Sequence, residues 1–113
     1  MKKLIPDCYW PSSKNGAYVS HEAICVLNVN RYPVRLSMCL YFEDRDKLDG
    51  FDVIVEAERT LHIRLDQLRN IQGKPIPMDT PYAILLESDQ DVAVQYTRVD
   101  TTQAELAIAT TMV

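Results

Sequence analysis

Apolar and polar residues alternate with a period of two over much of this chain, which is the pattern of strands that bury one face. The clearest segment is Val34–Phe42, whose alternate positions are all apolar. A second alternating segment, Leu61–Leu65, lies between polar neighbours. The side chains that the alternation places in the core are Leu36, Met38, Leu40, Phe42, Leu61, Ile63, Val92 and Val94.

Other apolar runs predict further strands at Tyr18–Asn28, Phe51–Val55, Tyr82–Leu86 and Val92–Tyr96. The last two runs are joined by five polar residues, 87–91, which we interpret as a hairpin loop.

Two segments are less regular. The stretch 65–78 carries Gly73, Pro75 and Pro77, so it is expected to be a loop that crosses between sheets or follows an edge. Residues 103–111 mix helix formers with β-branched residues, and a final strand is the interpretation we adopt. Because no segment before residue 100 shows a helical stripe of more than ten residues, the pattern predicts an all-β fold. We expect a single-domain β-sandwich, residues 1–113, of about seven to eight mostly antiparallel strands.

Composition narrows the classes of function. The 113 residues are 47% hydrophobic and 25% charged, with a net charge of −4, which is typical of a globular protein. No stretch concentrates positive charge, so a nucleic-acid partner is disfavoured. No apolar run approaches the roughly 20 residues that span a bilayer, and Lys2 and Lys3 are followed by too few apolar residues for a secretion signal. An odd number of cysteines, three, then favours reduced thiols and a soluble cytoplasmic protein.

The motifs of common catalytic and metal sites are missing from the sequence. The two histidines, His21 and His62, have no partner at metal-ligand spacing, and neither a GxSxG elbow nor a phosphate-binding glycine loop is present. Ser20-His21-Glu22 contains the residue types of a catalytic triad, but alternation along a strand sends His21 to the opposite face. We therefore expect no enzyme, no metal and no cofactor.

Polar residues gather in four places: Ser20-His21-Glu22, Arg59-Thr60, Asp79-Thr80 and the segment 95–100. Each has a local structural interpretation, since Asp79 can cap a turn, Arg59 can close a sheet edge and Arg98 can pair with Asp100. A structural network of Arg59, Arg98, Asp79 and Asp100 that pins loops at one end of the sandwich is the competing interpretation of the whole set.

The same clusters carry a resemblance to the sensory rhodopsin transducer family, which extends over about residues 5–111. The segment 20–28, SHEAICVLN, is close to the family's SHExxCxLN strand, and 56–60, EAERT, resembles its PARRT segment. The segment 75–80, PIPMDT, is similar to its PIPxDT loop, and 95–105, QYTRVDTTQAE, to its QxTRxD…QAE ending.

The resemblance implies a non-enzymatic β-sandwich that assembles as a homotetramer. Two functions follow from it: binding of a sugar or related metabolite, which we rank first, and docking as a cytoplasmic adaptor on a membrane photoreceptor such as a sensory rhodopsin. We expect the candidate residues to gather at one end or face of the sandwich, or across a subunit boundary, with Tyr9, Trp10 or Tyr96 beside them to stack on a sugar ring. These candidates are His21, Glu22, Arg59, Thr60, Asp79, Arg98 and Asp100.

Overall fold

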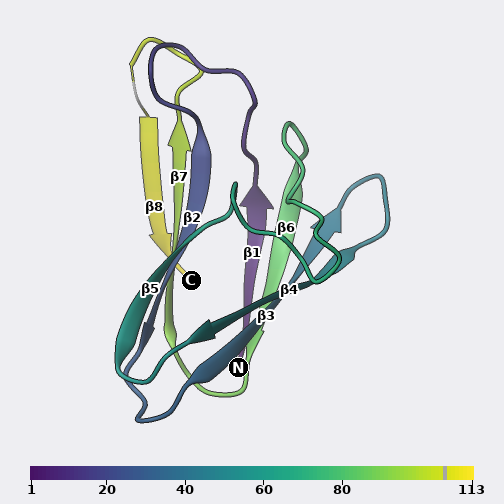
Figure 1. Ribbon diagram of the computed structural model, residues 1–113. Coiled ribbons are helices and arrows are strands. Elements are labelled where there is room, and N and C mark those ends of the chain that lie inside the picture. The colour runs from purple at the N-terminus through teal and green to yellow at the C-terminus, as the bar shows by residue number, and fades with distance from the viewer. Residues whose placement is uncertain (106) are drawn as a thin grey trace.

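The computed structural model describes residues 1–105 and 107–113, and within them the chain forms two four-stranded antiparallel sheets packed face to face (Figure 1). The first sheet has the strand order β1-β6-β3-β4 and the second has the order β5-β2-β7-β8. The strands are β1 (Lys2–Cys8), β2 (His21–Asn28), β3 (Val34–Phe42), β4 (Leu48–Val55), β5 (Arg59–Arg64), β6 (Tyr82–Ser88), β7 (Ala93–Asp100) and β8 (Ala107–Met112). The all-β sandwich is confirmed. Across the described residues there is no helix long and apolar enough to cross a membrane.

Most predicted strands lie where the alternation placed them, and β3 has the predicted bounds. The final strand β8 is also present, although residue 106 of the predicted segment lies outside the described residues. The strand β1 was not predicted, because only Ile5 and Cys8 of its seven residues are buried and its pairing is interrupted by a bulge between these two. An edge strand with so few buried positions gives no alternating signal.

The predicted hairpin between residues 82 and 96 is wrong. Strand β6 pairs with β1 and β3 in the first sheet, whereas β7 pairs with β2 and β8 in the second. The polar segment between them therefore crosses from one sheet to the other. A short polar connection fits either arrangement, and alternation along a strand does not say which strand is its neighbour. The stretch 65–78 crosses between the sheets as expected, because β5 belongs to the second sheet and β6 to the first.

The core lies between the two sheets and contains six of the eight predicted side chains in fully buried positions. The other two, Phe42 and Leu61, are half-buried and pack against the core from outside. Phe42 is the last residue of β3, where Arg45 lies over its ring with the guanidinium carbon 5.4 Å from the ring centre. Leu61 lies on β5, an edge strand. Both positions lie at the margin of the sandwich, where a neighbouring strand covers only one side.

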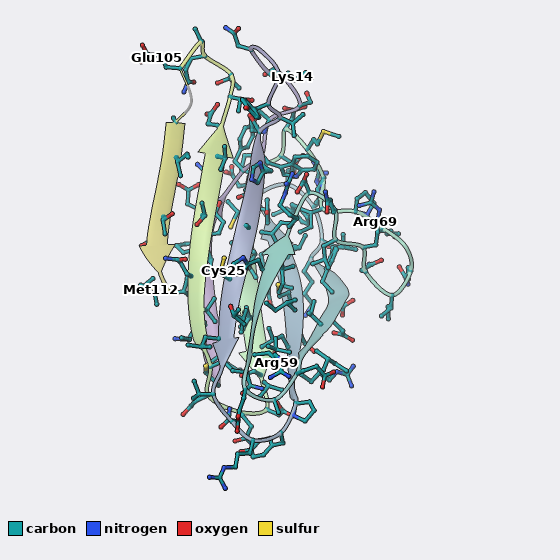
Figure 2. The ribbon with its side chains drawn as sticks, turned by 60° about the vertical axis from the view of Figure 1, so that its left-hand side comes forward. Lys14, Cys25, Arg59, Arg69, Glu105 and Met112 are labelled. Atoms are coloured by element: carbon teal, nitrogen blue, oxygen red, sulfur yellow. The ribbon has the colours of Figure 1, made fainter. Side chains whose placement is uncertain are left out.

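Figure 2 looks onto the outer face of the second sheet, with β8 at one edge and β5 at the other. Strand β2 runs down the middle of this sheet between β5 and β7. Because β2 has neighbours on both sides, its inward side chains reach the centre of the molecule and its two ends define the two ends of the sandwich. The candidate residues are best located along this strand.

Candidate functional site

Alternation along β2 determines which of its polar residues face the interior. His21 is half-buried on the outer face, while Glu22 and the residue just before β2, Ser20, are buried, at 0% and 3% exposed. The prediction that His21 points away from Ser20 and Glu22 is therefore confirmed. A carboxylate that is completely removed from water needs hydrogen-bond donors around it, and the structure supplies them.

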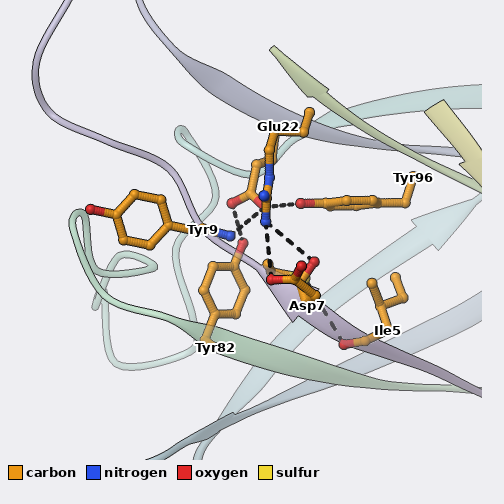
Figure 3. A network of polar contacts seen from close by, with 8 residues as sticks. Ile5, Asp7, Tyr9, Glu22, Tyr82 and Tyr96 are labelled. Carbon is orange, nitrogen blue, oxygen red and sulfur yellow. Dashed lines mark hydrogen bonds and ion pairs between the residues drawn. The ribbon is translucent and has the colours of Figure 1, made fainter. Parts of the chain in front are cut away.

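Three donors surround the Glu22 carboxylate (Figure 3). The Tyr82 hydroxyl donates to Oε1 at 2.6 Å, and the backbone N–H of Tyr9 donates to Oε2 at 3.0 Å. The Tyr96 hydroxyl also donates to Oε2. These donors come from β6, from the segment after β1, and from β7, so one carboxylate links both sheets. We call Glu22, Tyr82 and Tyr96 the buried carboxylate cluster.

Burial changes the acid–base behaviour of the groups around Glu22. Loss of solvent, and then the negative charge of Glu22, raises the pKa of Tyr82 well above its usual range. Burial and the hydrogen bond to Glu22 raise the pKa of Tyr96 in the same direction. The nearby thiol of Cys8 has its pKa raised to about 12, first by burial and then by the charge of Glu22. At neutral pH both phenols therefore keep their protons and remain donors.

Arg98 lies beside this cluster, at the position of β7 that pairs with Glu22 of β2. Its Nη2 donates to the Asp7 carbonyl oxygen at 3.3 Å and lies 3.5 Å from Asp7 Oδ1, a long contact to a carboxylate whose side chain is 87% exposed. Its Nε is buried and has no hydrogen-bond partner among the described residues. Burial disfavours the charged guanidinium, but contact with Tyr96 and the charges of Asp7 and Glu22 outweigh it, so the pKa of Arg98 is raised.

Arg98 also lines an open recess of about 190 Å³ at the margin between β7, β8 and the end of β1. The recess is lined by a guanidinium, a carboxylate, hydroxyl groups and part of a largely buried phenol ring. Its lining residues are Asp7, Tyr96, Arg98, Ala109, Thr110 and Thr111. We call this space the Arg98 recess. It offers both hydrogen-bond donors and acceptors to a small polar molecule.

Two further predicted residues bond to the backbone near them. Asp79 accepts a hydrogen bond from the Ser12 N–H at 2.9 Å, which lowers the pKa of its carboxyl. Asp100 accepts from the N–H and the hydroxyl of Thr102, at 2.8 Å and 2.6 Å, which has the same effect on its pKa. The predicted capping role of Asp79 fits this geometry, whereas the predicted pair of Arg98 with Asp100 is replaced by Arg98 with Asp7.

Arg59 and Thr60 lie at the other end of the sheet, so the seven candidates do not gather within one chain. Arg59 pairs with Asn28 and Thr60 pairs with Leu27, both at the end of β2. Asn28 is six residues from Glu22 along this strand. At about 3.3 Å per residue this places them roughly 20 Å away. Figure 2 shows Arg59 near the lower end of the sheet, and its Nη1 donates to the Glu58 carbonyl at 3.0 Å. The competing network of Arg59, Arg98, Asp79 and Asp100 is not formed among the described residues either.

Two residues that complete the site, Asp7 and Tyr82, were not among the candidates. Tyr82 is the first residue of β6 and occupies an inward position, so an inward-facing phenol in a predicted strand was the available signal. Asp7 lies in the β1 bulge, where the sequence gives no alternation. Within the described part of the chain, no three His, Cys, Asp or Glu side chains lie close enough to hold a metal ion.

Comparisons with known proteins show which family this chain belongs to and which solved structures have a similar fold. The family model of the Anabaena sensory rhodopsin transducer matches residues 2–113. The chain belongs to this family. Among solved structures, Thermotoga maritima 1070 is 32% identical with a TM-score of 0.86, and the match covers 98% of this chain and 90% of that one. The Anabaena sensory rhodopsin transducer itself is also 32% identical, with a TM-score of 0.77 and coverage of 91% and 90%. The comparison with curated protein sequences gave no match.

Membership of the transducer family confirms the resemblance drawn from the four motifs, and the two solved structures confirm the sandwich. The motifs have different structural environments within it. The segment 20–28 supplies β2 and the buried Glu22, and 95–100 supplies Tyr96 and Arg98 of β7, which lie together. The segment 56–60 covers the turn between β4 and β5 and the first two residues of β5, and 75–80 lies in the connection between β5 and β6.

Proposed function

We propose that this protein is a non-enzymatic cytoplasmic adaptor that relays a signal by docking on a membrane receptor of the sensory rhodopsin type. The observation that carries the proposal is the match of the transducer family over residues 2–113, together with a named transducer that is 32% identical over 91% of the chain. The likeness covers most of the chain, so it extends over both sheets of the sandwich.

The direct test uses a sensory rhodopsin in lipid nanodiscs. Binding is measured by isothermal titration calorimetry with the receptor in the dark and under illumination, and the decay of the receptor's photocycle intermediates is followed with and without the protein. The proposal expects saturable binding and a change in photocycle kinetics. Empty nanodiscs are the control. The proposal is contradicted if the protein binds neither the sensory rhodopsin of Anabaena nor a retinal protein encoded in the genome that encodes this chain.

Assembly into a homotetramer is part of the proposal. Support comes from β8, which is an edge strand of the second sheet and has all six residues exposed. Its sequence, AIATTM, contains no charge and no proline. Natural proteins protect such edges with charges, prolines or a covering element. Association with another copy hides the edge and adds buried surface to a small sandwich.

A second candidate function, binding of a sugar or related small metabolite, is favoured by the Arg98 recess. Its donors and acceptors are of the kinds that polyhydroxylated ligands use, and Tyr96 contributes an aromatic surface. The volume of about 190 Å³ is below the range of about 300 to 1,000 Å³ for drug-sized ligands, which fits a ligand of one sugar ring. Of the predicted residues, only Arg98 lines the recess, and Glu22 lies behind it.

Arg98→Ala tests the second function. A bound ligand raises the melting temperature by mass action, so a panel of sugars and small metabolites is screened against the wild type and the variant. The expected result is a ligand-induced rise in the wild type that Arg98→Ala abolishes while the free protein remains folded. The matched control is Arg35→Ala, because Arg35 is 66% exposed and pairs with Asp52 on the first sheet. A panel that leaves the wild-type melting temperature unchanged contradicts this function but leaves receptor docking intact.

A further inference from the structure

A row of soft ligand atoms crosses the outer face of the second sheet. The strand registers pair Cys25 of β2 with His62 of β5 on one side and with Gln95 of β7 on the other. Gln95 in turn pairs with Met112 of β8. Directly paired residues lie on the same face of a sheet, so a thiol, an imidazole and a thioether share one line. Figure 2 shows Cys25 and Met112 at a similar height across the sheet.

The residues of this row also share a recess. A groove of about 320 Å³ on this face is lined by Cys25, His62, Gln95 and Met112, together with small and apolar neighbours. The Cys25 thiol is free and half-buried, His62 is exposed, and Met112 is 67% exposed. No Asp, Glu, Lys or Arg lines the groove. The groove therefore offers sulfur and nitrogen ligands without carboxylates.

Distances across the sheet limit which atoms can meet. Paired residues on neighbouring strands have Cβ atoms about 4.5–5.5 Å apart, so the Cys25 sulfur and a nitrogen of His62 can ligate one ion. Met112 lies two strands from Cys25, at about twice the strand spacing of roughly 4.8 Å. Its unbranched side chain has enough freedom to lean over Gln95 toward the same ion.

We propose that Cys25, His62 and Met112 form a binding site for Cu(I). Thiolate and thioether sulfur are soft ligands that select this ion, and imidazole is compatible with it. Zn²⁺ is a poorer fit, since it takes three or four N, S or O ligands from the protein, and the described residues offer no such cluster of His, Cys, Asp and Glu. The site is independent of receptor docking and of the Arg98 recess, which lies on the inner side of the same sheet.

Binding requires the Cys25 thiolate, so each Cu(I) that enters displaces the thiol proton into solvent, and the affinity falls in acid. The ion remains Cu(I) throughout, and no redox step is involved. No spacing in the sequence indicates this site, because residues 25, 62 and 112 are far apart in the chain and only the strand registers bring them into one row.

The test is an anaerobic titration of the full chain with Cu(I), in competition with a chromogenic Cu(I) chelator. We expect one Cu(I) per chain in the wild type, and an affinity reduced by at least about 10-fold in Cys25→Ser and in His62→Ala, because loss of even an outer-shell partner of a metal ligand costs about 10- to 100-fold. Cys39→Ser is the matched control, because Cys39 is also a half-buried cysteine but lies on the first sheet; it should bind as the wild type does.

A second readout identifies the sulfur without a cysteine variant. After Cu(I) is added, alkylation followed by mass spectrometry should show Cys25 protected while Cys39 remains accessible. Equal affinity in Cys25→Ser and wild type, or protection of Cys39 in place of Cys25, overturns the proposal. If Cys25→Ser fails to fold, His62→Ala and Met112→Leu in the same titration decide it, since both side chains lie on the surface of a folded sheet. Wild-type affinity in both variants overturns the proposal.

Discussion

Glu22 shows how a single buried residue can define one end of the molecule. Its carboxylate is fully removed from water and receives two phenol hydroxyls and one backbone N–H. A buried charge is tolerated only when donors replace its hydration. Those donors come from three segments, so they must all be in place for the carboxylate to be satisfied. Glu22 therefore holds these three segments together at one end of the sandwich, next to the Arg98 recess.

Glu22→Ala is expected to lower the free energy of unfolding by about 3–5 kcal/mol, because it leaves two phenols and an N–H buried without an acceptor. Tyr82→Phe removes one donor and should cost less, about 1.5–3 kcal/mol. Urea denaturation followed by tryptophan fluorescence measures both. A Glu22→Ala variant within 1 kcal/mol of the wild type contradicts the central position given to this carboxylate.

The sequence predicted part of this residue-level picture. Alternation predicted that His21 and Glu22 point to opposite faces of one strand, and the structure shows that Glu22 is the inward one. It could not predict that Tyr82 and Asp7 complete the cluster, because those contacts depend on which strands are neighbours and on a bulge in β1. For the same reason it grouped Arg59 with residues that lie roughly 20 Å away.

At the level of elements, two of the four edge strands, β4 and β8, differ in the charge that they carry. Strand β4 has the charged residues Asp49 and Asp52, and the second of these is paired with Arg35. Strand β8 has no charged residue. Since charge on an outer strand discourages a further strand from pairing, β8 is the edge on which we expect self-association.

Ile108→Lys is expected to reduce the mass of the assembly in solution. Ile108 is 61% exposed on β8, so a lysine there costs little stability but places a charge in any strand-to-strand contact. The matched control is Ile54→Lys, because Ile54 is 59% exposed on β4, the corresponding strand of the first sheet. Multi-angle light scattering of wild type and both variants checks this. A monomeric wild type, or equal masses for the two variants, would count against association through β8.

The strands also show which elements alternation can and cannot predict. It found β3 with its bounds, because both neighbours of β3 are strands and one face is buried at every position but the last. It interpreted the β6–β7 connection as a hairpin, because a polar five-residue segment suits a hairpin and a crossing between sheets equally well. Alternation reports the face of a strand, whereas topology depends on long-range pairing that no local pattern contains.

For the whole molecule, β2 joins the two sheets at both of its ends. Glu22 near its start accepts from Tyr82 of the first sheet. Asn28 at its end is fully buried, and its amide nitrogen donates to the carbonyl oxygen of Val55, the last residue of β4, at 3.2 Å. The apolar core between these two polar links is thus closed at each end by hydrogen bonds. Stability of the sandwich then depends on the protonation state of the groups at the Glu22 end.

Stability should fall in alkali, beginning near pH 9. Burial and the Glu22 charge raise the pKa of Cys8 from 9.0 to about 12, and the pKa values of Tyr82 and Tyr96 are raised above 10.0. The folded protein therefore holds these protons more tightly than the unfolded chain. Below pH 9 these three groups are protonated in both the folded and the unfolded state, so their full contribution to stability is present. Above it the unfolded chain loses protons first, which lowers the free energy of unfolding by up to about 1.4 kcal/mol per pH unit for each group.

Urea midpoints measured between about pH 7 and pH 11 test this dependence. The variant Cys8→Ala separates the contribution of the thiol from that of the two phenols. The variant lacks the thiol, so its decline should begin about one pH unit later, where the unfolded chain starts to lose the protons of Tyr82 and Tyr96. Cys25→Ser is the control for removal of a thiol, because Cys25 lies on the outer face away from Glu22. Wild-type stability that stays constant to pH 11, or a decline in Cys8→Ala that begins at the same pH as in the wild type, would show that Cys8 is not held in its neutral form by burial beside Glu22.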